Sequence, residues 1–107
     1  MALSQNLLRT NRLMLDKELK SICRNVYFQP PESVKMTYPA IRYVRSNVVT
    51  AHGDNIPYKI NPIYTVIVID QDPDSLIVSA VSRLKGARHM RQYMSENLYH
   101  NVFTISR

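Results

Sequence analysis

The apolar residues near the start of the chain recur with a helical period. Leu8, Leu15, Leu19 and Ile22 follow one another at steps of seven, four and three, which places them on one face of a helix. Polar and basic residues fill the other side of this segment. The pattern therefore predicts an amphipathic helix over residues 4–22.

Three segments rich in β-branched and aromatic residues are predicted as strands. The first, residues 26–28, is short because two prolines soon follow it. Residues 38–45 form the second, with Pro39 near its start, where a missing backbone donor is tolerated. Residues 63–69 form the third, a nearly continuous apolar run. Such a run predicts cover on both faces, either by its own domain or on one face by a neighbouring subunit.

Turn-forming residues separate the second and third strands. Residues 46–62 contain His52-Gly53-Asp54-Asn55 and two prolines, Pro57 and Pro62. Glycine, asparagine, aspartate and proline punctuate regular structure. We therefore expect a long loop over residues 46–62.

A second helix and a hairpin are predicted in the last third of the chain. Asp72 is a good N-cap, Pro73 suits the first helical position, and Asp74 lies where the helix dipole favours negative charge. The helix is predicted to begin at Pro73 and to end at Gly86 in a left-handed cap. Residues 88–93 and 99–106 read as two antiparallel strands joined across Ser95-Glu96-Asn97.

The predicted order of elements is helix, strand, strand, strand, helix, strand, strand. A chain of 107 residues can build one hydrophobic core. We expect a single α+β domain over residues 1–107. It should hold one mixed or mainly antiparallel sheet of four to five strands, with both helices packed on it.

Composition and charge limit the class of protein. The longest apolar runs are too short to cross a membrane, the first residues do not resemble a secretory signal, and we expect a soluble protein. Cys23 is the only cysteine, so an internal disulfide is impossible, and we expect a buried thiol in a reducing cytoplasm. The net charge of +6 favours anionic partners, but the basic residues are scattered along the chain. A solvated surface and a specific anion-binding face both remain open.

Candidate chemistry is sparse. The sequence has no glycine-rich phosphate loop, dinucleotide fingerprint or Gly-x-Ser-x-Gly elbow, and its three histidines, His52, His89 and His100, lack metal-ligand spacing. Helix capping and strand termination explain Asp72 and Asp74 better than a cation site does. We expect no cofactor and no bound metal. A structural or binding subunit is favoured over an enzyme.

The order of segments resembles the tail-terminator, or tail-completion, proteins of long-tailed bacteriophages. The resemblance rests on the amphipathic first helix, the short strand at residues 26–28, and the aromatic-Pro-x-aliphatic opening of Tyr38-Pro39-Ala40-Ile41. It extends over the apolar strand Tyr64-Thr-Val-Ile-Val-Ile69, the Asp70-Gln-Asp-Pro-Asp-Ser75 stretch and the final strands, and so covers nearly all of the chain.

The resemblance implies a structural virion protein of the tail or neck, assembled in the host cytoplasm. It implies a homohexameric ring at the head-proximal end of the tail tube, which contacts the tail tube protein and the head-completion or connector protein. The ring would stop tube growth and provide the surface for head joining, with DNA passing through its channel. One alternative is a head-tail joining or head-completion protein of the same virion. A second is a small basic nucleic-acid-binding protein.

Two groups of residues are candidate contacts. Long connections on a rigid sheet commonly carry binding residues, which singles out Asp54, Asn55, Tyr58 and Lys59. Arg42 and Arg45 form the other group, and whether they face the ring interface or the DNA channel remains open at this stage.

Overall fold

The computed structural model describes residues 2–30, 35–53 and 56–106, and the side chains of residues 8–30, 35–47 and 62–106. The elements are α1 (Ala2–Ile22), β1 (Val26–Phe28), β2 (Ala40–Gly53), β3 (Ile56–Asp70), α2 (Leu76–Ser82), β4 (Ala87–Ser95) and β5 (Leu98–Ser106). The predicted order of helices and strands is confirmed. Within the described part of the chain, neither helix is long and apolar enough to cross a membrane.

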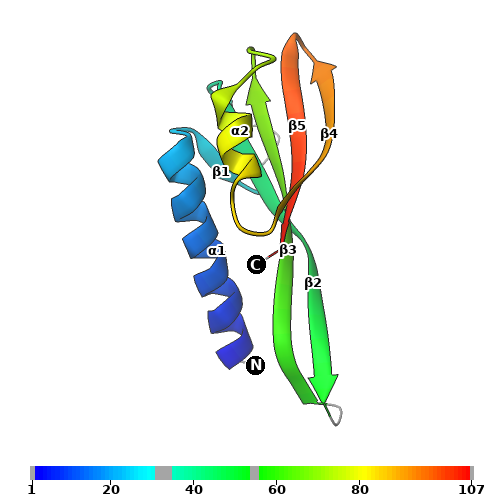
Figure 1. Cartoon of the computed structure of the whole chain (residues 1–107). Coiled ribbons are helices and arrows are strands. Elements are labelled where there is room, and N and C mark those ends of the chain that lie inside the picture. Colours follow the sequence, from blue (N-terminus) through cyan, green and yellow to red (C-terminus); the bar gives the residue numbers. More distant parts are fainter. Residues whose placement is uncertain (1, 31–34, 54–55, 107) are drawn as a thin grey trace.

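The five strands form one mixed sheet in the order β1-β2-β3-β5-β4. β1 pairs with β2 in parallel, and every other neighbouring pair is antiparallel. Both helices lie on the same face of this sheet, which we call the helix face (Figure 1). The predicted α+β fold, with two helices packed on a single mixed sheet, is therefore confirmed.

The hydrophobic core lies between the helices and the helix face. The helices contribute Leu15, Leu19 and Val81, which pack against alternate residues of the three central strands: Ile41, Tyr43, Tyr64, Val66, Val68, Phe103 and Ile105. Leu15 and Leu19 belong to the apolar period that predicted α1, and both are fully buried. Cys23 is buried beside them, as expected.

The opposite face of the sheet, which we call the open face, has no helix in the described part of the chain (Figure 1). Tyr27 points to this face, because its neighbours Val26 and Phe28 pack against the core. The Tyr27 hydroxyl accepts a hydrogen bond from the backbone N–H of Thr37 at 3.3 Å. The segment that leads into β2 therefore crosses the open face at its β1 edge. Residues 63–69 were expected to be covered on both faces, either by their own domain alone or on one face by a neighbouring subunit. On the helix face the cover comes from the domain's own helices.

The predicted loop over residues 46–62 is wrong. This segment is a β-hairpin, because β2 continues to Gly53 and β3 begins at Ile56. Val48, Val49 and Ile60 are β-branched residues that favour strands. The prolines that indicated a loop lie where β3 has a strand partner on only one side, so a missing backbone donor is tolerated there.

The predicted start of the second helix is also wrong. α2 begins at Leu76, and Ser75 is its N-cap, with the Ser75 hydroxyl accepting from the Ile77 N–H at 3.2 Å. Asp70 and Asp72 instead accept from the N–H groups two residues onward, at 3.2 and 2.9 Å, and so stabilise a turn before the helix. Asp74 lies in that turn, outside the helix.

Gly86 adopts the predicted left-handed conformation, with φ of 79°. It does not cap the helix, because α2 ends at Ser82 and Arg83 is its C-cap. Gly86 instead is the last residue of the turn before β4, and its carbonyl accepts from the N–H of Ser106 at 3.2 Å. A Cβ atom at this position would lie 2.4 Å from the Ser106 carbonyl oxygen, which is too close for any side chain.

The predicted C-terminal hairpin is confirmed. β4 and β5 are joined at Glu96 and Asn97, whose φ angles of 53° and 64° are those of a two-residue hairpin turn with both central residues left-handed. Asparagine tolerates this conformation better than most residues do.

Candidate functional site

The hairpin of β2 and β3 extends beyond the five-stranded part of the sheet and forms an arm. We define the arm as residues 47–53 of β2 and 56–62 of β3. On one side, pairing of β2 with β1 ends at Tyr43; on the other, pairing of β3 with β5 begins at Ile63. No third strand among the described residues pairs with the arm, which projects from the body (Figure 1). The arm gives the molecule its elongated dimensions of 51 × 26 × 23 Å.

Two of the six candidate contact residues, Tyr58 and Lys59, belong to the arm. Tyr58 and Lys59 lie in β3, with Lys59 opposite Ala51 of β2, and their side chains lie outside the described ones. Asp54 and Asn55 lie outside the described residues. The arm therefore replaces the expected loop as the part of the fold that presents Tyr58 and Lys59.

Arg42 and Arg45 lie on opposite faces of the sheet. Arg42 is exposed on the open face, where it is paired in register with Ile67 of β3. Arg45 is half-buried on the helix face, where its guanidinium donates to the Leu8 carbonyl of α1 at 3.4 Å. The same guanidinium lies 5.7 Å from the centre of the Tyr64 ring. The structure therefore does not bring these two arginines together.

A basic pocket lies between α1 and β2 beside Arg45. Its volume is about 360 Å³, and Leu8, Arg9, Arg12 and Arg45 line it. Arg12 also lies over the Phe28 ring, with 4.7 Å between the guanidinium carbon and the ring centre. The Arg12 contact with Phe28 ties α1 to β1, whereas Arg45 packs on Tyr64 within the sheet and reaches α1 through its hydrogen bond to the Leu8 carbonyl.

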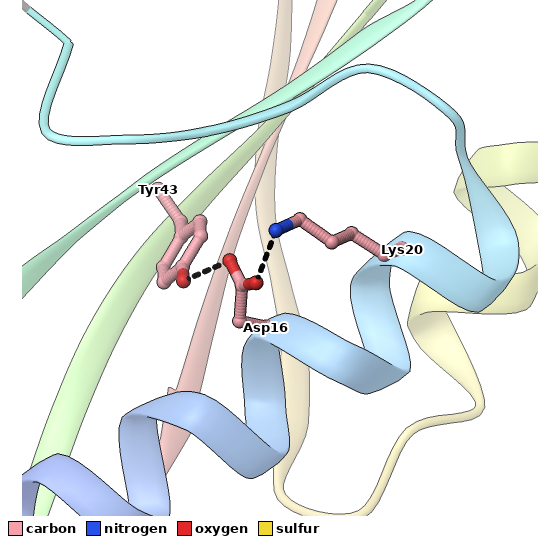
Figure 2. Close-up of polar contacts among 3 residues, drawn as sticks. All are labelled: Asp16, Lys20 and Tyr43. Carbon is pink, nitrogen blue, oxygen red and sulfur yellow. Dashed lines mark hydrogen bonds and ion pairs between the residues drawn. The ribbon is translucent and has the colours of Figure 1, made fainter.

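A polar contact fixes the middle of α1 to β2 (Figure 2). The Tyr43 hydroxyl donates to Asp16 Oδ1 at 2.5 Å, and Lys20 Nζ lies 2.7 Å from Asp16 Oδ2. Burial of Asp16 opposes its ionisation. The hydrogen bonds from Lys20 and Tyr43 and the charges of Lys20 and Arg12 outweigh this, so the pKa of Asp16 lies below its ordinary value of 3.8. Burial, then the hydrogen bond to the Asp16 carboxylate, raises the pKa of Tyr43 above 10.0.

The arrangement of β4 was not foreseen from the sequence. β4 is an edge strand, and almost all of its residues are exposed, including Met90 at 54% and Met94 at 57%. A bulge between His89 and Arg91 changes which face its later residues occupy. Arg88 and Arg91 are three residues apart, so a regular strand would place them on opposite faces. The bulge places them on the same face.

The two described histidines make local contacts. His89 Nε2 lies 3.0 Å from Asn101 Oδ1, and its ring meets that of Phe103 edge-on. His100 Nδ1 donates to the Leu98 carbonyl at 3.1 Å, and its ring stacks on that of Tyr93. Among the described side chains, no three histidine, cysteine or carboxylate groups gather in a way that could hold a metal ion.

Neither the comparison with protein-family models nor the search of curated proteins gives a match. Function must therefore be argued from the surfaces of the molecule. Three surfaces stand out: the arm, the exposed edge of β4, and the open face of the sheet.

Proposed function

We propose that this chain is a structural virion protein that forms a ring at the head-proximal end of a phage tail tube. In this proposal the ring stops growth of the tube and provides the surface for head joining. The observation that carries it is the arm, which projects from a small core and has strand edges without a partner in the described chain.

An arm of this kind gains stability from a partner. A two-stranded hairpin alone in water is only marginally stable, because it buries little apolar surface. Its outer edges also present backbone N–H and C=O groups that another chain can pair with. A partner that covers these edges stabilises the arm and obtains a large contact area from a small subunit.

The fold also provides a second, different surface for such a contact. β4 lies at one edge of the sheet, whereas β1 and the arm lie towards the other. A ring requires a head-to-tail contact in which two different surfaces of each subunit meet, and repetition of that contact closes the ring. The exposed apolar side chains of Met90 and Met94 suit the β4 edge to burial in such a contact.

The experiment is electron microscopy of the purified protein alone, after mixing with isolated tail tubes, and after mixing with portal complexes. A six-fold ring that caps one end of the tube is the expected result. Attachment to portal complexes with no attachment to tubes would replace this proposal with that of a head-tail joining protein. Absence of rings both alone and on tubes would reject both.

A pair of double variants tests the role of the arm. Replacing Tyr58 and Lys59 together with alanine should abolish or strongly weaken tube capping. The matched control replaces Lys35 and Tyr38 with alanine. These are an exposed lysine and an exposed tyrosine outside the arm, so their replacement should leave capping unchanged. Circular dichroism of both variants verifies the fold. Equal capping by the two variants would remove Tyr58 and Lys59 from the contact.

A further inference from the structure

The bulge in β4 places three exposed side chains on one face. Before it, Arg88 is paired with Thr104; after it, Arg91 is paired with Val102 and Tyr93 with His100. In a regular strand, residues 88 and 91 would point to opposite faces. The extra residue at the bulge puts Arg88, Arg91 and Tyr93 on the same face. Bulges commonly redirect side chains in this way at sites of function.

This shared face is the open face of the sheet. Phe103 and Ile105 of β5 pack into the core on the helix face, so the alternate residues His100, Val102 and Thr104 point the other way. Arg88, Arg91 and Tyr93 are paired with these alternate residues. No helix covers them in the described part of the chain (Figure 1).

Arg91, Tyr93 and His100 contact one another in turn on this face, and Arg88 lies further along β4. The Tyr93 and His100 rings stack with centres 4.8 Å apart and an angle of 10° between their planes. The Arg91 guanidinium carbon lies 5.6 Å from the centre of the Tyr93 ring, and Tyr93 is 40% exposed. We call Arg88, Arg91, Tyr93 and His100 the β4–β5 strip. Arg91 is thereby held by an aromatic ring while remaining exposed.

The surroundings of the strip are apolar or basic. Val102 and Ile67 lie next to Arg91 in the same row across the sheet, and Arg42 follows on β2. Among the described strand residues that point to the open face, none is aspartate or glutamate. Within the described strands, the exposed guanidinium groups therefore have no carboxylate beside them on this face, and this part of the surface is complementary to a polyanion.

We propose that the β4–β5 strip binds a nucleic-acid strand. Arg88 and Arg91 contact the phosphodiester groups, and the exposed part of Tyr93 contacts a sugar or an unstacked base. Basic side chains interleaved with aromatic rings on an exposed sheet are the arrangement that single-stranded nucleic-acid binders use. An acidic peptide would be satisfied by the arginines alone and would not require the stacked pair. This binding belongs to the single subunit and does not depend on ring assembly.

The test is fluorescence anisotropy of the purified full chain with a labelled oligothymidylate of about 16 nucleotides, and separately with a duplex of similar length. Titrations run from about 50 to 200 mM salt, because phosphate contacts appear as a slope of log affinity against log salt. Replacing Arg88 and Arg91 together with alanine should reduce that slope by about 1.4 for the single strand and by about 1.8 for the duplex.

Two further variants separate the aromatic contribution from charge. Tyr93→Ala should weaken binding of the single strand by about fivefold or more, whereas Tyr93→Phe should retain it. The matched charge control replaces Arg24 and Arg83, two exposed arginines outside the strands, and should alter the slope much less than the strip variant does. Circular dichroism verifies that each variant is folded.

Each outcome decides the proposal. Stronger loss on the single strand than on the duplex upon Tyr93→Ala supports contact with unstacked bases, and equal losses support contact with the backbone. Absence of salt-dependent binding overturns the proposal, as does an equal loss in the Arg24 and Arg83 control. Binding of labelled oligoglutamate as tight as that of the oligonucleotide, unchanged by Tyr93→Ala, would make the strip an acidic-protein surface. Tube capping is measured separately, so failure of either proposal leaves the other intact.

Discussion

Replacing Tyr43 with phenylalanine removes one hydroxyl from the contact that fixes α1 to the sheet. The hydroxyl donates to the Asp16 carboxylate at 2.5 Å, while the ring packs 4.9 Å from Phe28 and 6.2 Å from Tyr64. Phenylalanine keeps both ring contacts, so the change reports on the hydrogen bond alone.

The expected cost follows from the charge and exposure of the partner. A hydrogen bond to a charged group contributes about 1.5–3 kcal/mol. In the variant, Asp16 still forms its ion pair with Lys20 and is partly exposed to solvent. The expected loss of stability therefore lies at the lower end of this range, about 1.5 kcal/mol. For a domain of this size, that corresponds to a fall in Tm of about 6 °C. Lys20→Met is the control and should cost less than about 1 kcal/mol, because the Lys20 side chain is 58% exposed.

The pH dependence provides a second readout. The pKa of Asp16 is lowered in the folded state, so its contribution is present above 3.8 and is lost as pH falls through the folded pKa. The pKa of Tyr43 is raised, so its contribution is present below 10.0 and is lost as pH rises beyond that value. The stability difference between the wild type and Tyr43→Phe should therefore shrink at both extremes.

The assay is urea denaturation followed by circular dichroism, at neutral pH and at both ends of the range. A cost below about 0.5 kcal/mol at neutral pH would contradict the assigned hydrogen bond. A cost that stays the same at acid pH would show that ionisation of Asp16 does not contribute to it.

Three further substitutions test the local structure through the free energy of unfolding. Gly86→Ala should destabilise the fold by at least about 1 kcal/mol, because its φ is positive and a Cβ would clash with the Ser106 carbonyl; an unchanged Tm would contradict this geometry. Ser75→Ala should cost about 1 kcal/mol through loss of the N-cap of α2, and should cost more than Asp72→Ala if Ser75 is the cap. Leu19→Ala should lower the free energy of unfolding by about 2–5 kcal/mol, because Leu19 is fully buried in the core. A loss of less than about 1 kcal/mol would indicate that Leu19 does not pack in the core.

The sequence predicted those elements whose local signals agree with their tertiary setting. The helical period of α1 identified Leu15 and Leu19, which are buried against the sheet. The β4–β5 hairpin was predicted from two strand-like segments joined across Ser95-Glu96-Asn97, and Asn97 suits the left-handed backbone that the observed turn requires. In both cases, propensity and packing favour the same structure.

The incorrect predictions arose where a local signal has two structural meanings. Pro57 and Pro62 indicate a loop in isolation, yet both are compatible with a strand that lacks a neighbour on one side. Aspartate and serine are both residue types that cap helices, but only Ser75 caps α2, and its hydroxyl also donates a hydrogen bond to Asp70 at 2.6 Å. Pairing and tertiary contacts decide such cases, and neither is visible in the linear pattern.

The candidate site was predicted only in part for a related reason. The importance of residues 46–62 was inferred from the length of the expected loop, whereas their form as an arm depends on where β1 and β5 stop pairing. The strip on β4 was missed because a bulge shifts the alternation between Arg88 and Arg91. A bulge arises from the pairing of two strands, so the sequence of one strand does not predict it.

The two proposals have a common geometric consequence. If subunits join head to tail through the arm on one side and the β4 edge on the other, the symmetry turns the open face of every subunit to an equivalent position in the ring. Six copies of the β4–β5 strip would then lie on one circular surface, and a nucleic acid that contacts several of them would bind more tightly than it binds one subunit. Affinity for the same oligonucleotide should therefore rise when rings form. Unchanged affinity in rings would indicate that the strips lie too far apart for one strand, or that the β4 edge is covered by the neighbouring subunit.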